Sequence, residues 1–233
     1  QTAAEDARSQ AVELAAGKMD VNPAELVVQE GRIYLKGDPK KGMTLAEAAA
    51  LAPYVLGSPI LGTGASLRKA KFVGAMPGEE WLDAPQHGTH AVKVRVDPDT
   101  GKVKVLKYFA CHDVGFAINP QNVEGQIEGG VGFGVGYALS EEVVIKEGKT
   151  INPNLTDYRI PTAMDIPDIR TEIVEIPSRS GPFGAKGLGE ATNVPVAPAI
   201  VNAVCEAAGV RITELPLTPE KVFQALQEKA SRG

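Results

Sequence analysis

One acidic side chain, Glu190, lies among glycines at the start of an apolar stretch, in the segment GPFGAKGLGEATNVPVAPAIVNAV of residues 181–204. Gly187 and Gly189 precede it, so another group could closely approach the backbone beside this carboxylate. A carboxylate held next to a reacting group can act as a general base. The structural alternative is an acid near a helix N-terminus, where the helix dipole favours it by about 0.3–1 kcal/mol.

A second segment, NPQNVEGQIEGGVGFGVGYALSEE of residues 119–142, is rich in glycine. Asn119 followed by Pro120 is typical of a helix N-cap and first helical position, so a helix is predicted from Pro120 to about Leu139. Each interior glycine weakens a helix by about 1 kcal/mol relative to alanine. Either tight helix packing or the close approach of a flat ligand could compensate, and Gln126 offers donors and acceptors to a heterocycle.

Other motifs that carry chemistry are missing from the sequence. It contains neither a GxGxxG nor a GxxxxGK[ST] nucleotide-binding pattern, and the three histidines have neither zinc-finger nor HExxH spacing. Two cysteines cannot supply the roughly four ligands of an iron–sulfur cluster. His112 follows Cys111, but neighbouring strand residues face opposite sides, so a structural histidine is predicted there.

The elements that position these segments mix helices and strands without a regular strand–helix–strand repeat, which predicts an α+β fold. Two compact parts, at approximately 1–85 and 86–233, are expected, and the Gly- and Pro-rich stretch 53–81 is predicted to be irregular. Apolar periodicity and turn residues predict helices at 3–18, 44–51, 120–139, 195–208 and 220–228, and strands at 26–29, 32–36, 91–96, 103–109, 142–146 and 170–176.

Composition restricts the possible partners and compartment. The 233 residues carry a formal charge of −5, which argues against nucleic acid as a partner. No apolar run is long enough to span a membrane, and no signal-peptide pattern opens the sequence. Two cysteines cannot form a disulfide framework, which favours a reducing, cytoplasmic compartment. The first residue is Gln1 and not Met, so we expect a truncated portion or a natural split chain of a larger subunit.

Three segments together resemble one family, the xanthine dehydrogenase/aldehyde oxidase family of molybdenum hydroxylases. They are CHDVGFAINPQNVEGQIEGGVGFGVGYALSEE at 111–142, NPNLTDYRIPTAMDIP at 152–167, and the segment 181–204 that contains Glu190. They occur in the order found in the family, and the similarity extends through nearly the whole chain. The resemblance is to the C-terminal part of the molybdopterin-binding large subunit, and it implies mixed sheets packed with helices.

The resemblance implies a catalytic role for one residue. The acid of the family's GxGE signature, here Glu190, is the active-site base beside molybdenum. The glutamine of the family's EGQ-EG motif contacts the pterin, and here it is Gln126. In this interpretation, the glycines before Glu190 leave the backbone uncovered because a cofactor, and not another part of the protein, lies next to it.

Five further cofactor-binding residues are implied by the same resemblance. The turn containing Lys186, Gly187 and Gly189 matches backbone that lies against the metal centre in relatives. The stretch from Asp113 to Asn119 matches a region near the pyrophosphate of the pterin or its attached nucleotide. No protein side chain is expected to ligate the metal, because in this family the pterin dithiolene holds molybdenum.

The implied activity is hydroxylation of an electron-poor carbon, in an N-heterocycle or an aldehyde, with oxygen derived from water. The implied cofactor is molybdopterin or molybdopterin cytosine dinucleotide with molybdenum. A heteromeric complex is expected, with an upstream molybdenum-subunit chain, an iron–sulfur subunit carrying 2Fe–2S clusters and a flavin subunit carrying FAD. The alternatives are aromatic thioester reduction, carbon monoxide oxidation, or a noncatalytic assembly subunit of the same fold.

Overall fold

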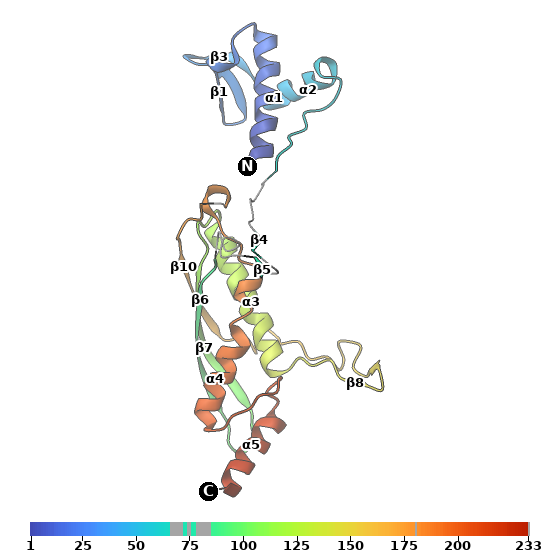
Figure 1. The fold of residues 1–233 in the computed structure, drawn as a ribbon, viewed down its shortest axis with the longest axis vertical. Coiled ribbons are helices and arrows are strands. Elements are labelled where there is room, and N and C mark those ends of the chain that lie inside the picture. Colours follow the sequence, from blue (N-terminus) through green and yellow to red (C-terminus); the bar gives the residue numbers. More distant parts are fainter. Residues whose placement is uncertain (66–71, 74–75, 78–84, 180, 233) are drawn as a thin grey trace. The chain divides into compact units, whose positions relative to one another are not determined.

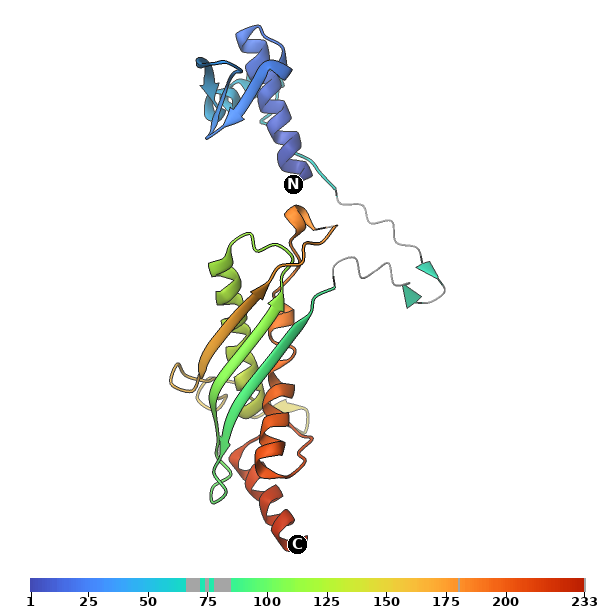
Figure 2. The same cartoon turned by 90° about the vertical axis from the view of Figure 1, so that its left-hand side faces the viewer.

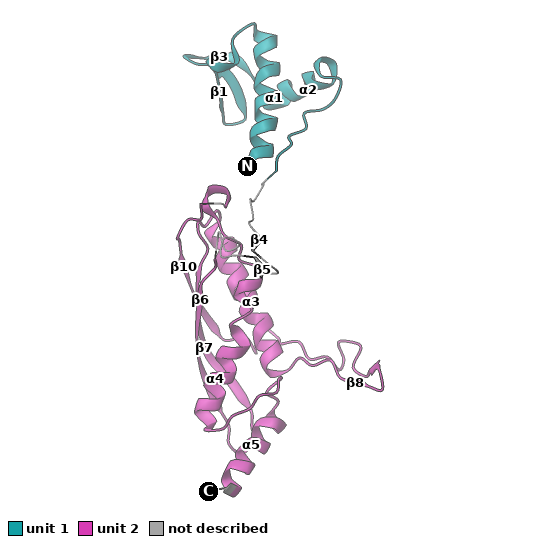
Figure 3. Cartoon of the chain, viewed as in Figure 1, with its two compact units in different colours: residues 1–78 teal, residues 79–233 magenta. Residues whose placement is uncertain are grey.

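The computed structural model describes residues 1–65, 72–73, 76–77, 85–179 and 181–232. The chain divides into two compact units, residues 1–78 and residues 79–233 (Figure 3). The sequence had placed this division near residue 85. Each unit has its own buried core, and the units are described separately below.

The first unit packs helices against a small antiparallel sheet (Figure 1). Its buried core is mostly alanine, from helices α1 and α2, together with Ile33 of β2. Thr44 and Glu47 form the capping box that opens α2, at the place where the sequence predicts a helix. Its elements are α1 (Thr2–Met19), η1 (Pro23–Glu25), β1 (Leu26–Gln29), β2 (Arg32–Leu35), β3 (Asp38–Thr44) and α2 (Leu45–Val55).

The second unit is organised by a three-stranded sheet in the order β10-β7-β6. The central strand β7 (Val103–Asp113) pairs antiparallel with β6 (Gly88–Val96) and parallel with β10 (Asp168–Val174). The outer face of β6 carries Lys93 and Arg95, whereas its alternating valines face the core. This alternation is the pattern of a strand with one buried and one wet face.

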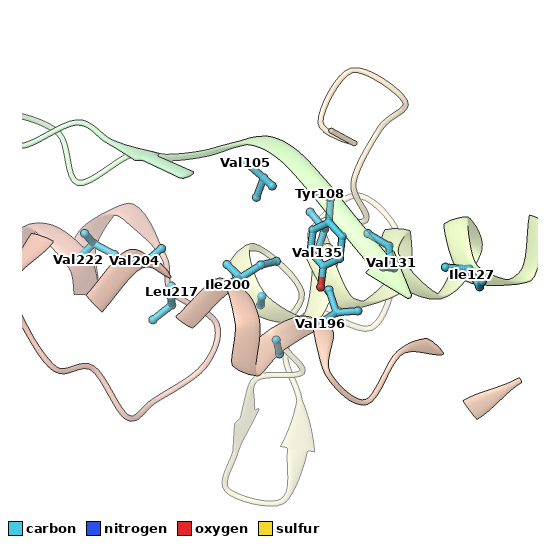
Figure 4. Packing of buried hydrophobic residues seen from close by; sticks show 13 residues of the cluster. Val105, Tyr108, Ile127, Val131, Val135, Val196, Ile200, Val204, Leu217 and Val222 are labelled. Carbon is cyan, nitrogen blue, oxygen red and sulfur yellow. The ribbon is translucent and has the colours of Figure 1, made fainter. Parts of the chain in front are cut away.

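Two helices cover the same face of this sheet: α3 (Pro120–Leu139) packs over β10 and α4 (Val196–Ala208) packs over β6 (Figure 2). Between them and the sheet lies the main core, in which Tyr108 of β7 is surrounded by valines of α3 and α4 (Figure 4). The remaining elements are β8 (Ile145–Lys146), β9 (Lys149–Thr150), η3 (Pro182–Gly184), η4 (Glu190–Thr192) and α5 (Pro219–Arg232), with the short strands β4 (Phe72–Val73) and β5 (Met76–Pro77) earlier in the chain.

Two of the six glycines in α3 are explained by close packing against η4 and α4. A Cβ on Gly130 would collide with Thr192, and a Cβ on Gly134 would collide with Val196. These two positions, one helical turn apart, allow α3 to lie close to η4 and α4. Gly125 and Gly129, and likewise Gly132 and Gly136, are also spaced by about one helical turn, a spacing that lets another backbone or a flat ligand come close. A Cβ on Gly136 would collide with Glu141 and Pro161, whereas one on Gly125 or Gly129 would meet no described atom within 4 Å.

The predicted α+β fold class is confirmed, and most predicted elements are present with ends shifted by a few residues. Two predictions were wrong in detail. Strand β3 was not expected, and the strand predicted at 142–146 is restricted to β8, which forms a two-stranded hairpin with β9. Much of the predicted irregular stretch 53–81 lies outside the described residues. No helix in the described part of the chain is long and apolar enough to cross a membrane.

Candidate cofactor-binding site

The parallel strands β7 and β10 end at the same edge of the sheet, where Asp113 is paired with Val174. In sheets with parallel strands, ligands usually bind beyond the carboxyl ends of those strands. Helix α3 begins a few residues after β7, and its first position is Pro120 behind the N-cap Asn119. Chain turns from three segments therefore meet at this edge, and most of the predicted site residues lie there.

A buried ion pair joins two of these segments. The Lys186 Nζ donates to a carboxylate oxygen of Asp113, and both side chains are nearly inaccessible, at 6% and 4% exposure. The same Nζ donates to the carbonyl of Pro85 at 3.1 Å. Burial alone would raise the pKa of Asp113, but the hydrogen bonds from Lys186 and from two backbone N–H groups outweigh it and lower that pKa.

Backbone contacts reinforce this junction. The other carboxylate oxygen of Asp113 accepts from the N–H of Gly115 at 3.0 Å and of Ile176 at 3.2 Å. The N–H of Lys186 donates to the carbonyl of Val114 at 2.9 Å. Gly115 has a φ of +73°, and a Cβ there would collide with the Gly184 carbonyl and press on Lys186. Asp113 thus ties the ends of β7 and β10 to the loop that leads to Glu190.

A groove of about 520 Å³ opens beside this junction. Its polar lining comes from the N-terminal part of α3, through Asn119, Asn122 and Gln126. The opposite side is formed by the loop Ala185–Gly189, and the wall is completed by apolar residues that include Phe116 and Ile118. The groove therefore combines an amide side chain, an open glycine backbone and an apolar surface, which together suit a flat polar heterocycle.

Glu190 lies next to this groove without lining it. Gly189 is the N-cap of the short helix η4, and Glu190 is the first residue of η4 with an exposed side chain. A Cβ on Gly189 would lie 3.7 Å from Nε2 of Gln126, so the glycine loop and α3 nearly touch here. The Thr192 hydroxyl donates to the carbonyl of Gly189 at 2.9 Å and holds the turn around Glu190.

Gln86 lies behind the glycine loop and was not selected from the sequence. Its Nε2 is buried and has no hydrogen-bond partner among the described residues. A Cβ on Gly187 would lie 3.8 Å from this atom. No motif surrounds Gln86 in the sequence, so only its position in the fold brings it to this site.

A buried polar chain also lies on the inner face of the sheet. The Nδ1 of His90 is 2.8 Å from the Tyr108 hydroxyl, and its Nε2 is 2.8 Å from Nε2 of His112. Desolvation, followed by the proximity of His112, lowers the pKa of His90 to about 4, and desolvation lowers the pKa of His112. His112 is therefore part of a neutral, buried network, consistent with the predicted structural role.

The structure brings the sequence-predicted site residues to one end of the second unit. Asn119, Gln126, Lys186 and Gly189 line the groove, and Gly187 is part of the same loop. The side chains of Asp113 and Lys186 are occupied with each other, and the side chain of Asn119 caps α3 by accepting from Asn122 N–H at 3.1 Å. For these three residues, the groups left to face a ligand are mainly backbone.

Within the described ranges, no group of three or more His, Cys, Asp or Glu side chains is arranged to hold a metal ion. The polar groups that face the groove are amides and backbone, which suit an organic cofactor.

The groove between a glycine loop and the start of a glycine-rich helix is a candidate cofactor-binding site of the second unit. The sequence profile of the molybdopterin cofactor-binding domain matches residues 1–167. The chain therefore belongs to the molybdopterin cofactor-binding domain family.

Individual relatives agree with this assignment. The chain is 44% identical over 142 residues to the xanthine dehydrogenase molybdenum-binding subunit of Escherichia coli O157:H7, covering 60% of this chain and 19% of that protein. It is 33% identical over 230 residues to the nicotine 6-hydroxylase large subunit of Paenarthrobacter nicotinovorans, covering 94% and 27%. The crystal structure of quinoline 2-oxidoreductase from Pseudomonas putida 86 matches with a TM-score of 0.72 and 32% identity, over 97% of this chain and 28% of that one.

Proposed function

We propose that this chain is the C-terminal part of the molybdenum-binding large subunit of a hydroxylase that oxidises an electron-poor carbon. The observation that carries the proposal is the juxtaposition of Gln126, the open backbone at Gly189 and the exposed carboxylate of Glu190 around one groove edge. The amide that we propose to bind the cofactor and the candidate base are thus adjacent on two different elements.

The residues present fit a molybdopterin cofactor. The amide of Gln126 can both donate to and accept from a pterin ring, and Gly187 and Gly189 leave the loop backbone uncovered. The N-terminal end of α3 favours a negatively charged group such as a pyrophosphate, and Asn119 and Asn122 lie beside it. When bound, the molybdenum cofactor supplies two-electron redox chemistry. The proposed cofactor is molybdopterin or its cytosine dinucleotide form.

Glu190 is proposed as the general base. Its carboxylate would accept a proton as the oxygen derived from water attacks the substrate carbon, a transfer that positioned carboxylates perform efficiently. The turn that carries it is fixed by the Thr192 hydroxyl and by the packing of Gly130 on Thr192. Its side chain is exposed in this chain, so it is available to a cofactor and substrate brought to the groove.

The proposed substrate is a small N-heterocycle or aldehyde. Two relatives that match nearly the whole chain are named for N-heterocyclic compounds, nicotine and quinoline. The carbon next to the ring nitrogen of such a compound is electron-poor and therefore open to attack by an oxygen nucleophile. Residues that select among such substrates are expected in the part of the large subunit that this sequence does not match.

The proposed enzyme is heteromeric. The chain spans 19%, 27% and 28% of the three relatives described above, so most of a family large subunit lies outside it. We propose that the remaining large-subunit polypeptide, an iron–sulfur chain with 2Fe–2S clusters and a flavin chain with FAD complete a cytoplasmic complex. In that complex, electrons taken from the substrate would leave through the partner chains.

The proposal is tested by assembling the complex and measuring its metal, pterin and reaction product. We expect molybdenum and pterin in a one-to-one ratio with the large subunit, and hydroxylation of an N-heterocycle or aldehyde with labelled oxygen from labelled water. A complex that holds the cofactor but only reduces thioesters or oxidises carbon monoxide would refute the proposed reaction. A complex without molybdenum would instead support a noncatalytic assembly role.

A further inference from the structure

The outward face of α3 carries glycines that nothing in the described chain explains. A Cβ added to Gly125 or Gly129 would have no described atom within 4 Å outside its own helical turn. Both positions are exposed, in contrast to Gly130 and Gly134, which are packed against Thr192 and Val196. Glycine in a helix interior weakens the helix relative to alanine, so two glycines facing open space are unfavourable for this chain by itself.

The same face continues into exposed aromatic residues. Phe133 is 73% exposed and Tyr137 is 58% exposed. Together with Gly125 and Gly129 they are spaced by four residues, so all four positions follow one line along α3. We call these four residues the outer stripe. Large aromatic side chains in such a row are typical of a surface that another polypeptide covers.

A groove borders the aromatic end of the outer stripe. It has a volume of about 520 Å³ and is lined by Tyr137, Val194, Ala197 and Val201, with Leu215 at its far side among others. Val194, at the start of the α4 region, is 71% exposed. The stripe and this groove therefore form one continuous apolar surface over α3 and α4.

We propose that the outer stripe docks the part of the large subunit that lies outside this sequence. Small residues at its beginning let a second backbone approach α3 closely, and Phe133 and Tyr137 anchor in pockets of that polypeptide. This inference rests on the proposed function, because it takes the chain to be one portion of a larger subunit. The comparisons support this occupant. The quinoline 2-oxidoreductase structure matches 97% of this chain, but the match covers only 28% of that longer chain, so a large polypeptide remains that could pack on the stripe.

The position of the stripe supports this occupant over a second copy of the chain. Gln126 immediately follows Gly125 in sequence and lines the candidate cofactor groove. A polypeptide that packs along the stripe would therefore reach the groove edge beside Gln126. Ligand sites usually bury most of the ligand surface, and a polypeptide packed along the stripe would cover a ligand bound in this groove.

The first test rests on Gly129→Leu, which should not destabilise the isolated chain but should weaken its association with the rest of the subunit. In the full chain, Gly129→Leu should leave the melting temperature unchanged or raise it, because a side chain there meets open space and leucine is a better helix former. In the assembled complex it should weaken association about tenfold or more, as should Phe133→Asp. Glu206→Leu, at an exposed position of α4 that does not line the groove beside Tyr137, is the matched control and should assemble normally. Normal assembly of both Gly129→Leu and Phe133→Asp would overturn the proposal.

The second test identifies the occupant. A photo-crosslinking amino acid at position 133 of the assembled enzyme should link to large-subunit residues outside this 233-residue sequence, as determined by mass spectrometry. Links to a second copy of this sequence, to an iron–sulfur or flavin chain, or within the sequence itself would overturn the proposal. Failure of the proposed function would appear differently, as an assembled complex that is cross-linked as expected but has no molybdenum or no hydroxylase activity.

Discussion

Lys186 and Asp113 form a buried ion pair although they are 73 residues apart in the chain. Asp113 ends the central strand β7, and Lys186 belongs to the loop that leads to Glu190. The pair fixes the glycine loop to the strand ends. Three further hydrogen bonds support it, two accepted by Asp113 from backbone N–H groups and one accepted by the Pro85 carbonyl from Lys186. Because each charge is satisfied by the other, we interpret these side chains as positioning groups and their neighbouring backbone as the ligand-facing surface.

Breaking this pair is expected to destabilise the second unit strongly. Lys186→Met leaves the Asp113 carboxylate buried without its counter-ion, which typically reduces the free energy of unfolding by about 3–5 kcal/mol. Denaturant unfolding of the full chain measures this loss. The double variant Asp113→Asn/Lys186→Met removes both charges and should be more stable than Lys186→Met alone. A single variant within about 0.5 kcal/mol of the parent would contradict a structural role for the pair.

Close packing of α3 against α4 depends on Gly134. Gly134→Ala places a Cβ against Val196, which is fully buried, so overpacking should lower the free energy of unfolding by about 1–3 kcal/mol. The matched control is Gly125→Ala, where the added methyl group meets open space and should stabilise the chain by up to about 1 kcal/mol. Thermal unfolding distinguishes them by the sign of the change. If both substitutions changed the stability equally, Gly134 would not be the position at which α3 packs closely on Val196 of α4.

The histidine network predicts a specific dependence of stability on pH. His90 has an ordinary pKa of 6.5 in the unfolded chain and a pKa of about 4 in the folded one. Between these values the unfolded state binds the proton and the folded state does not, so stability is complete above pH 6.5 and decreases as the pH falls towards 4.

The decrease over this range should be a few kcal/mol at most, and it should be smaller in His90→Phe. An NMR titration of the imidazole protons gives the folded-state value directly. Titration of His90 near pH 6.5 in the folded chain would contradict its buried, hydrogen-bonded environment.

Sequence patterns predicted the local parts of this fold well. The N-cap at Asn119, the capping box at Thr44 and the alternating valines of β6 are each determined by neighbouring residues, so the elements they begin were found. The strands predicted at 91–96 and 103–109 are present as β6 and β7, and both observed strands are longer than predicted.

Long-range relationships could not be predicted in the same way. The parallel pairing of β10 with β7 joins strands separated by α3, and no local signal specifies it. The contact of Lys186 with Asp113 and the network of His90 with His112 follow from that pairing and from the hairpin register. Resemblance to a family selected Asp113 and Lys186, but only the fold shows that they bind each other.

The central claim is that Glu190 is the base of a molybdenum-dependent hydroxylation. The most direct test is the turnover of the assembled enzyme with Glu190→Gln, measured together with its molybdenum and pterin content. Glu206→Gln, which changes an exposed acid on α4, is the matched control. We predict that Glu190→Gln reduces kcat by about 10²–10⁴-fold or more while cofactor content stays at the parent level. Turnover close to that of the parent enzyme, with full cofactor content, would contradict the claim.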